Sequence, residues 1–251
     1  MTILTSKDNP KVRHWAKLAS DARYRKAEQH ALIEGPHLIT AFQASGAKAV
    51  AILVTEKALA GKEIAGLIGA RPTIVSEGVF RSIVDAENPP GIAAEIAIPA
   101  PKAKAGSDVV FLEGVQDPSN VGAIIRSAAA FGVGEIVLDQ ACADVWSPRA
   151  LRAGMGGHFS LAIRQVPQLQ LNDFEGKLVC TVVRGGTPIG TAKLEGRLGW
   201  IFGGEGRGVS PELERLARTK VTIPISPGTE SLNVAAAAAI CFYEASKTPR
   251  S

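Results

Sequence analysis

The sequence predicts an α/β protein built from two parts. Short apolar stretches of strand length alternate with helical segments along most of the chain. A stretch low in bulky apolar residues, PAPKAKAGS at 99–107, interrupts this alternation as a linker does. The chain has 251 residues, 46% of them hydrophobic, which is enough for two cores. We therefore predict a small α/β domain over 1–98, a linker at 99–107 and a second α/β domain over 108–251.

The first domain is predicted to open with a helix over 9–20. Asn9-Pro10 is typical of a helix start, and apolar residues recur along one side of the segment. Proline at the first turn and glycine after the last turn mark a second helix at 36–46. The remaining expected elements are strands at 31–35, 49–54, 73–76 and 91–98 and helices at 56–67 and 79–84. No element of this domain carries a catalytic pattern.

Positive charge is concentrated at the start of the chain. Residues 1–30 contain seven basic and three acidic side chains, whereas the whole chain has a net charge of +4, so the rest is balanced. A basic segment ahead of a balanced body is typical of a protein that binds a polyanion, most often nucleic acid, and a solvated helix face is the alternative. The candidate RNA-binding residues are Lys11, Arg13, Arg23, Arg25 and Lys26, with Arg149 and Arg152 further along, where a solvated helix face is again the alternative.

Cysteine and histidine placement argues against disulfides and metals. The cysteines are far apart and form no C-x-x-C pair, so we expect neither a zinc site nor a disulfide framework, and a reducing compartment. The histidines match no metal-ligand spacing, so no metal is predicted. These residues are Cys142, Cys180 and Cys241, and His14, His30, His37 and His158. No stretch has the length of a membrane span or the pattern of a signal peptide, so we expect no membrane partner and a cytoplasmic location.

The second domain is predicted to begin with a strand at 108–115, followed by a helix within 117–134 and a strand at 135–139. Arg126 is the unusual member of that helix, because an unpaired guanidinium is costly to bury among alanine and isoleucine. A salt bridge to Glu113 or Glu205 explains it, and so does a ligand-facing arginine. The pattern does not choose between them.

A glycine-rich loop follows a predicted strand at 198–204. Glycines at 203, 204, 206 and 208 allow positive φ and leave amides unobstructed, which suits close approach of a ligand. The spacing does not fit the dinucleotide fingerprint, and a simple turn is the alternative. Ser210-Pro211 then starts a helix, and a strand at 221–226 and a helix at 230–247 are expected after it.

Three ordered motifs carry a family resemblance. Asn120-x-Gly122-x-x-x-Arg126, then Gly204-Glu205-Gly206-x-Gly208, then Ile223-Pro224 with Glu230-Ser231-Leu232-Asn233 resemble the motifs of the SpoU/TrmH family of RNA ribose 2′-O-methyltransferases, of the SPOUT class. The likeness covers about 108–247, including SPRALRAGMGGHF at 147–159. Residues 1–98 resemble the substrate-binding domain often fused ahead of it, which is similar in fold to a ribosomal RNA-binding protein.

The resemblance implies a parallel sheet with a deep trefoil knot, an exception to the rule that chains do not thread loops. It implies that S-adenosyl-L-methionine binds in the knot and that the protein is a homodimer whose active site is completed across the interface. The positions that match the family's cofactor contacts and their loop are Gly203, Gly204, Gly206, Ile223 and Leu232.

The resemblance also implies catalytic roles. Arg126 would activate the ribose hydroxyl, either as a base after losing its proton or as a charged group that stabilises the forming alkoxide. Asn120 and Glu205 would orient it, while Ser231 and Asn233 would hold a phosphate and the knot backbone. Asn120 or Ser231 as a simple helix cap, and Glu205 paired with Arg207 or Arg126, are the alternatives.

The function predicted from this resemblance is S-adenosylmethionine-dependent methylation of a ribose 2′-hydroxyl in structured RNA. Ribosomal RNA of the 23S type is preferred over tRNA, because the fused first domain is more typical of that branch. The alternatives are a tRNA 2′-O-methyltransferase and a catalytically silent RNA-binding knotted dimer. A nucleotide-binding enzyme that uses the glycine loop for phosphate is the most distant alternative, since the P-loop lysine signature is missing.

Overall fold

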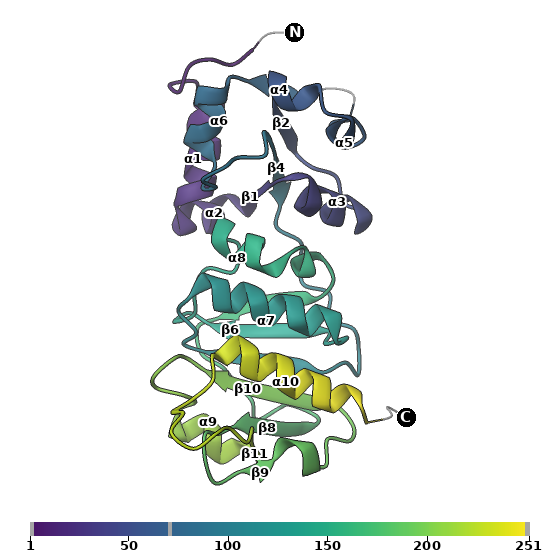
Figure 1. Cartoon of the computed structure of the whole chain (residues 1–251), viewed down its shortest axis with the longest axis vertical. Helices are drawn as coiled ribbons and strands as arrows, with labels where there is room; N and C mark the ends of the chain where they lie inside the picture. Colours follow the sequence, from purple (N-terminus) through teal and green to yellow (C-terminus); the bar gives the residue numbers. More distant parts are fainter. Residues whose placement is uncertain (1–2, 70–71, 249–251) are drawn as a thin grey trace. The chain divides into compact units, whose positions relative to one another are not determined.

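The computed structural model describes residues 3–69 and 72–248 and divides into two compact units (Figure 1). The first comprises Met1–Pro99 and Asp144–Phe159, and the second comprises Ala100–Ala143 and Ser160–Ser251. The break after Pro99 falls at the expected linker. The expectation of one continuous second domain over 108–251 differs from this division, because 144–159 packs with the first unit.

The first unit is built on a four-stranded sheet with the order β1-β4-β2-β3. Only the β2–β3 pair is parallel, while β4 runs antiparallel to both β1 and β2. Its strands are β1 His30–Glu34, β2 Ala51–Thr55, β3 Thr73–Val75 and β4 Ile92–Ala97. Its helices are α1 Pro10–Ser20, α2 Ala22–Glu28, α3 Pro36–Ala44, α4 Glu56–Leu59, α5 Lys62–Ala65, α6 Glu77–Ile83 and α8 Pro148–Gly154, with a 3-10 turn, η1, at Gly157–Phe159.

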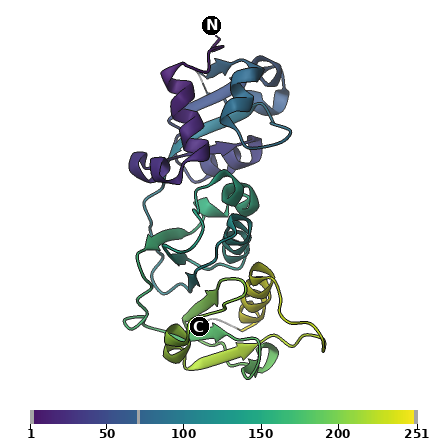
Figure 2. The same cartoon turned by 90° about the vertical axis from the view of Figure 1, so that its left-hand side faces the viewer.

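Helix α1 packs beside α6 over one face of this sheet (Figure 2). The Asn9 side chain accepts the Lys11 amide hydrogen and so caps the helix. Val12, Trp15 and Leu18 repeat at helical spacing and are buried with Phe80 of α6. The single helix expected over 56–67 is instead two short helices, α4 and α5, and α2 was not predicted.

The segment 144–159 is held to the first unit by specific contacts. Arg25 is buried, and its Nε lies 2.7 Å from Asp144 Oδ2. The Phe42 and Phe159 rings meet edge to face with centroids 5.2 Å apart. Gly156 has φ +89°, and a Cβ there would lie 2.6 Å from Ala41 Cβ, so a larger residue does not fit. The segment is therefore part of this unit's core.

Buried His158 makes the first unit sensitive to acid. The residue is 2% exposed, its Nε2 lies 2.9 Å from Val145 O, and burial lowers its pKa from 6.5 to about 4. The unfolded chain binds a proton here below pH 6.5, whereas the folded unit does so only near pH 4. The unfolding free energy therefore falls as the pH drops through this window, and we expect a loss of about 3 kcal/mol, measurable by urea denaturation.

The control for this prediction is a comparison of two variants. His158→Gln should remove this part of the pH dependence, whereas His37→Gln, at an exposed histidine of the same unit, should retain it. The Glu34 carboxyl, whose pKa burial raises, contributes a slope of opposite sign that cancels in the comparison. An unchanged pH slope in His158→Gln would contradict the assignment.

The second unit is built on a seven-stranded sheet with the order β7-β6-β5-β10-β8-β11-β9, in which every pairing is parallel. The predicted α/β class and parallel sheet are confirmed. The strands are β5 Val109–Glu113, β6 Glu135–Asp139, β7 Ala162–Val166, β8 Lys177–Thr181, β9 Thr187–Pro188, β10 Leu198–Gly203 and β11 Thr219–Thr222. The helices are α7 Pro118–Ala130, α9 Pro211–Leu216 and α10 Val234–Ser246, with a 3-10 turn, η2, at Ile189–Thr191.

Helices α7 and α10 lie side by side over one face of this sheet (Figure 1). Trp200 and Phe202 of β10 project to that face and meet the Phe242 ring of α10 with centroids 6.3 and 5.8 Å apart. Ile201, between them in the strand, projects to the other face and packs with Leu213 of α9. Among the described residues, no helix combines the length and apolar content needed to cross a membrane.

The three cysteines are buried free thiols. Burial raises the pKa of Cys142, Cys180 and Cys241 to about 12 in each case. Each is therefore protonated at neutral pH, because thiolate forms only near the pKa. None of the three is therefore present as a thiolate nucleophile at neutral pH.

Candidate active site

The candidate site lies at the edge of the seven-stranded sheet where its strands end. Because all strands are parallel, their carboxyl ends meet at one edge, which is where ligands of open α/β sheets bind. A cavity of about 460 Å³ opens there, between the segments that follow β8, β10 and β11 and the start of α10. Its volume is in the range of small-molecule sites.

The structure brings the five expected cofactor-binding residues to this one cavity. They come from the end of β10 and the loop after it, from the residue after β11, and from the segment before α10. They are Gly203, Gly204, Gly206, Ile223 and Leu232. Strand β11 is shorter than the expected 221–226 and ends at Thr222, so Ile223 lies just beyond it, half-buried at the cavity wall. Cofactor binding by these residues stays a prediction.

The glycine loop after β10 is a tight closed turn. The Gly208 amide donates to the Gly204 carbonyl at 3.0 Å, and Gly206 and Gly208 have φ of +81° and +67°. A Cβ on Gly203 would lie 2.0 Å from the carbonyl carbon and oxygen of Gly208. A Cβ on Gly204 would lie 2.2 Å from the Gly114 carbonyl oxygen. Positions 203 and 204 therefore require glycine, because the backbone there contacts other backbone atoms and leaves no room for a Cβ.

Asn120 joins two of the other candidate residues. Its Nδ2 donates to Glu205 Oε1, and its Oδ1 accepts from Asn233 Nδ2 at 2.8 Å. Helix α7 is capped by Asp117 instead, so Asn120 is not its cap. Asn233 caps α10 by accepting from the amides of Ala235 and Ala236, which leaves Ser231 exposed at the cavity rather than capping.

Arg126 is a candidate catalytic residue that lies outside the cavity of its own chain. It is exposed on α7 and is not among the cavity's lining residues. In the described part of the chain, the two carboxylates considered for a salt bridge have other partners: Glu113 accepts from the Ser210 amide, and Glu205 accepts from Asn120. The salt-bridge explanation of Arg126 therefore receives no support.

Several cavity residues were missed from the sequence. Thr181, Val182 and Val183 end and follow β8, a strand that was not predicted. The apolar run LVCTVV at 178–183 was the available signal. The Asp139 carboxylate also accepts from the Gly114 amide at 3.1 Å and holds the chain that leads from β5 to α7. Its position at the end of a predicted strand did not reveal this role.

The expected RNA-binding residues divide into two groups. The residues whose side chains are exposed to solvent are Lys11, Arg13, Arg23, Lys26 and Arg149. The prediction for Arg25 is wrong, because it is 4% exposed and its guanidinium donates to Asp144 and the Leu18 carbonyl. The Arg152 guanidinium lies 2.7 Å from Asp85 Oδ2 and 3.7 Å from Glu34 Oε2, so its positive charge is paired with carboxylates of the same unit.

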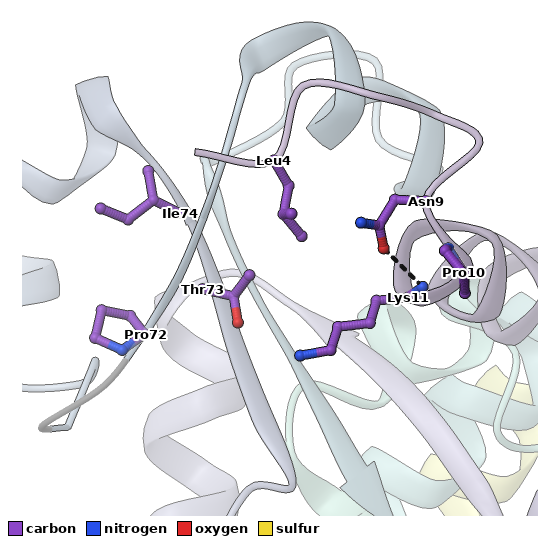
Figure 3. Close-up of a pocket in the computed structure, with 7 residues that line it drawn as sticks. All are labelled: Leu4, Asn9, Pro10, Lys11, Pro72, Thr73 and Ile74. Carbon is purple, nitrogen blue, oxygen red and sulfur yellow. Dashed lines mark hydrogen bonds between the residues drawn. The ribbon is translucent and has the colours of Figure 1, made fainter. Parts of the chain in front are cut away.

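Lys11 also borders a pocket of about 520 Å³ in the first unit (Figure 3). Figure 3 shows its side chain extending toward Thr73, with Asn9 beside it. The pocket therefore offers the ammonium group of Lys11, from the start of α1, and the hydroxyl group of Thr73, from β3.

Both parts of the sequence match known families. Residues 108–243 match the family model described as the SpoU rRNA Methylase family, and residues 9–94 match the MRM3-like substrate binding domain. The chain is similar to the 23S rRNA (guanosine(2553)-2′-O)-methyltransferase RlmP of Bacillus subtilis, with 31% identity over 247 residues that cover 97% of this chain and 98% of that protein.

Solved structures are similar over almost the whole chain. One is an RNA 2′-O ribose methyltransferase with a TM-score of 0.84 and 26% identity, covering 98% of both chains. Another is the SpoU methyltransferase AviRb of Streptomyces viridochromogenes in complex with AdoMet, with a TM-score of 0.85, 24% identity and coverage of 95% and 97%. The second likeness supports the fold.

Proposed function

The chain belongs to the SpoU rRNA methylase family, and we propose from this premise that it methylates a ribose 2′-hydroxyl of structured RNA with S-adenosylmethionine as the donor. The observation that carries the proposal is the cavity at the sheet edge, where the glycine loop, Ile223 and Leu232 meet beside the Asn120 network. The RNA we expect is 23S-type ribosomal RNA, since the near full-length Bacillus subtilis relative is named for that substrate.

The cavity residues fit a methyl donor of this kind. Glycines 203 and 204 present backbone without side chains, and Phe202, Ile223 and Leu232 supply apolar surface. The Glu205 carboxylate at the same cavity suits a sulfonium, which is a cation. When bound, S-adenosylmethionine supplies an electrophilic methyl group on that sulfonium.

The chain's own residues would then position the acceptor. With the donor held there, the ribose oxygen would form a bond to the methyl carbon as the carbon–sulfur bond breaks, and the hydroxyl proton would pass to water. Correct placement of two reactants is worth about 7–11 kcal/mol. Asn120 fixes Glu205 and Asn233 relative to one another, and Ser231 offers a hydroxyl to an RNA phosphate at the cavity rim.

Arg126 is proposed to act in a homodimer, at the site of the other subunit. Arg126 is exposed on a helix that buries Val121, Ile124 and Ile125, and it does not line the cavity of its own chain, which supports this proposal. A deep trefoil knot is proposed for 198–246. The strand order supports it, because β10 inserts between β5 and β8 and the chain then returns to β11 on the far side of β8.

The first unit is proposed to bind RNA through its exposed basic residues. Residues 9–94 match a substrate-binding family model, and Lys11 borders the pocket of Figure 3.

A cytoplasmic location is proposed on the basis of the ribosomal RNA substrate. We propose that RNA is bound by the domain expected at 1–98 and methylated by the domain expected at 108–251, with a linker at 99–107. These bounds describe the two functions only, because 144–159 packs with the first unit.

The experiment that tests the function is methyl transfer to separated RNA fractions. The protein is incubated with labelled S-adenosylmethionine and either ribosomal RNA or tRNA, and 2′-O-methyl sites are mapped. Label in ribosomal RNA alone supports the proposal, and label in tRNA alone supports the tRNA alternative. Cofactor binding without label in either fraction supports the catalytically silent dimer, and absence of both binding and label rejects the proposal.

Asn120→Asp is expected to lower methyl transfer by about 10- to 100-fold. It replaces the amide that donates to Glu205 with a second carboxylate, and like charges at this distance repel by one to several kcal/mol. Asn172→Asp adds the same charge at an exposed position of the same unit outside the cavity and should have little effect. Equal rates for both variants would contradict a role for the Asn120 network.

A further inference from the structure

The first unit contains a cluster of two histidines and a glutamate from three separate elements. His14 lies on α1, His30 on β1 and Glu95 on β4. Glu95 Oε1 lies 3.0 Å from His14 Nε2 and 2.6 Å from His30 Nδ1. The sequence spacing concealed this cluster, because the three residues are far apart in the chain and only the fold brings them together.

We propose that His14, His30 and Glu95 form a binding site for a divalent transition metal of the zinc type. Imidazole nitrogen and carboxylate oxygen are ligands that Zn²⁺ uses in proteins, and two histidines with one glutamate are a known ligand set for a three-coordinate protein site. The site is independent of the methyl-transfer cavity, which lies in the other unit.

The donor atoms are already near the spacing that such an ion requires. One ligand atom from each residue lies within 4.8 Å of the other two. Zinc–ligand bonds of about 2.0–2.2 Å give about 3.3–3.5 Å between donors of a tetrahedral site. The two nitrogen–oxygen distances of 3.0 and 2.6 Å therefore need to expand by less than an ångström, within the range of side-chain rotation.

Two neighbouring groups hold the ligands in orientation. Tyr24 Oη lies 2.8 Å from His14 Nδ1, the ring nitrogen that faces away from Glu95. Trp15 Nε1 donates to Glu95 Oε2 at 2.8 Å and leaves Oε1 for the ion. With a metal on Nε2, His14 Nδ1 carries hydrogen and donates to Tyr24. Metal-bound histidines and carboxylates usually have outer partners of this kind.

The Glu95 side chain is buried, whereas the two histidine side chains are partly exposed, and both features suit a metal site. The Glu95 side chain is 8% exposed, so its charge is poorly solvated and a cation there offsets that cost. The His14 and His30 side chains are 25% and 28% exposed, which gives an ion an entry path and leaves a fourth position for water. The ion would tie α1 to both β1 and β4.

The test is titration of the chelator-treated full-length protein, without a histidine tag, with Co²⁺ as a spectroscopic substitute for zinc. We expect one equivalent to bind with visible absorption typical of nitrogen–oxygen ligation, and Zn²⁺ to displace it. His14→Gln and His30→Gln keep an amide donor to Glu95 and should each weaken binding by more than about 100-fold. Tyr24→Phe, which removes an outer partner, should weaken it by about 10- to 100-fold.

His37→Gln, at an exposed histidine of the same unit, is the matched control and should bind as the wild type does. Far-ultraviolet circular dichroism of each metal-free variant verifies that it is folded. The proposal is overturned if no saturable Co²⁺ absorption develops, or if binding persists unchanged in both His14→Gln and His30→Gln. No RNA or methyl donor enters the assay, so its result is separate from that of the methyl-transfer test.

Discussion

Replacement of Arg126 with alanine is expected to reduce the rate of methyl transfer by about 10²- to 10³-fold, while S-adenosylmethionine affinity changes by no more than a few fold. Removal of one preorganised group that stabilises developing negative charge has an effect of this size. Affinity is expected to persist because the proposed cofactor-binding residues that line the cavity, Gly203, Ile223 and Leu232, are unchanged. Single-turnover rates with RNA and calorimetric titration with the cofactor measure the two quantities separately.

Two further variants sharpen the Arg126 test. Arg215→Ala removes an exposed arginine from α9, outside the cavity lining, and should leave the rate unchanged. A mixture of Arg126→Ala subunits with subunits that carry Gly203→Ala should recover activity, because a mixed dimer contains one intact site if the arginine acts across the interface. Full activity of Arg126→Ala alone would remove the residue from the mechanism.

Gly203→Ala is expected to weaken cofactor binding on the order of 100-fold and to lower the unfolding free energy by about 1–3 kcal/mol. A single methyl group at this position would lie 2.0 Å from the Gly208 carbonyl, and backbone cannot move aside as a side-chain end does. The loop from 204 to 208 must open to accept it. Cofactor titration and urea denaturation report the two effects.

Gly190→Ala is the matched control for this substitution. A methyl group on Gly190, in the 3-10 turn η2 of the same unit, would meet nothing within 4 Å, and the residue is exposed. It should retain both cofactor affinity and stability. If Gly203→Ala also binds the cofactor normally, the loop does not form the cofactor site.

The fold was predictable where local signals and burial agree. Proline at the first turn located α3, α7 and α9, and β5, β6 and β10 are buried parallel strands that read as continuous apolar runs. Strand β7 was missed because polar residues interrupt its apolar pattern. Strand β8 was missed because its apolar run is short and is followed by a sequence rich in turn residues. Helix α2 was missed since its polar composition resembles a solvated linker.

The candidate site was predictable as a set of residues but not as a network. The motifs identified Asn120, Glu205 and Asn233, yet only the parallel sheet edge explains why they meet. Arg25 was misassigned because charge composition does not distinguish a surface cation from one buried against Asp144. The His14 cluster was missed for the same reason that most tertiary sites are, since it depends on strand pairing.

The interrupted first unit affects how the protein is made. Its last portion, Asp144–Phe159, is translated only after β5, α7 and β6 of the second unit. The ion pair of Arg25 with Asp144 and the ring contact of Phe42 with Phe159 therefore form only after that later segment has been synthesised. During synthesis the amino-terminal sheet cannot finish folding before part of its neighbour has emerged, so truncation after Pro99 would yield a fragment that lacks part of its own interior.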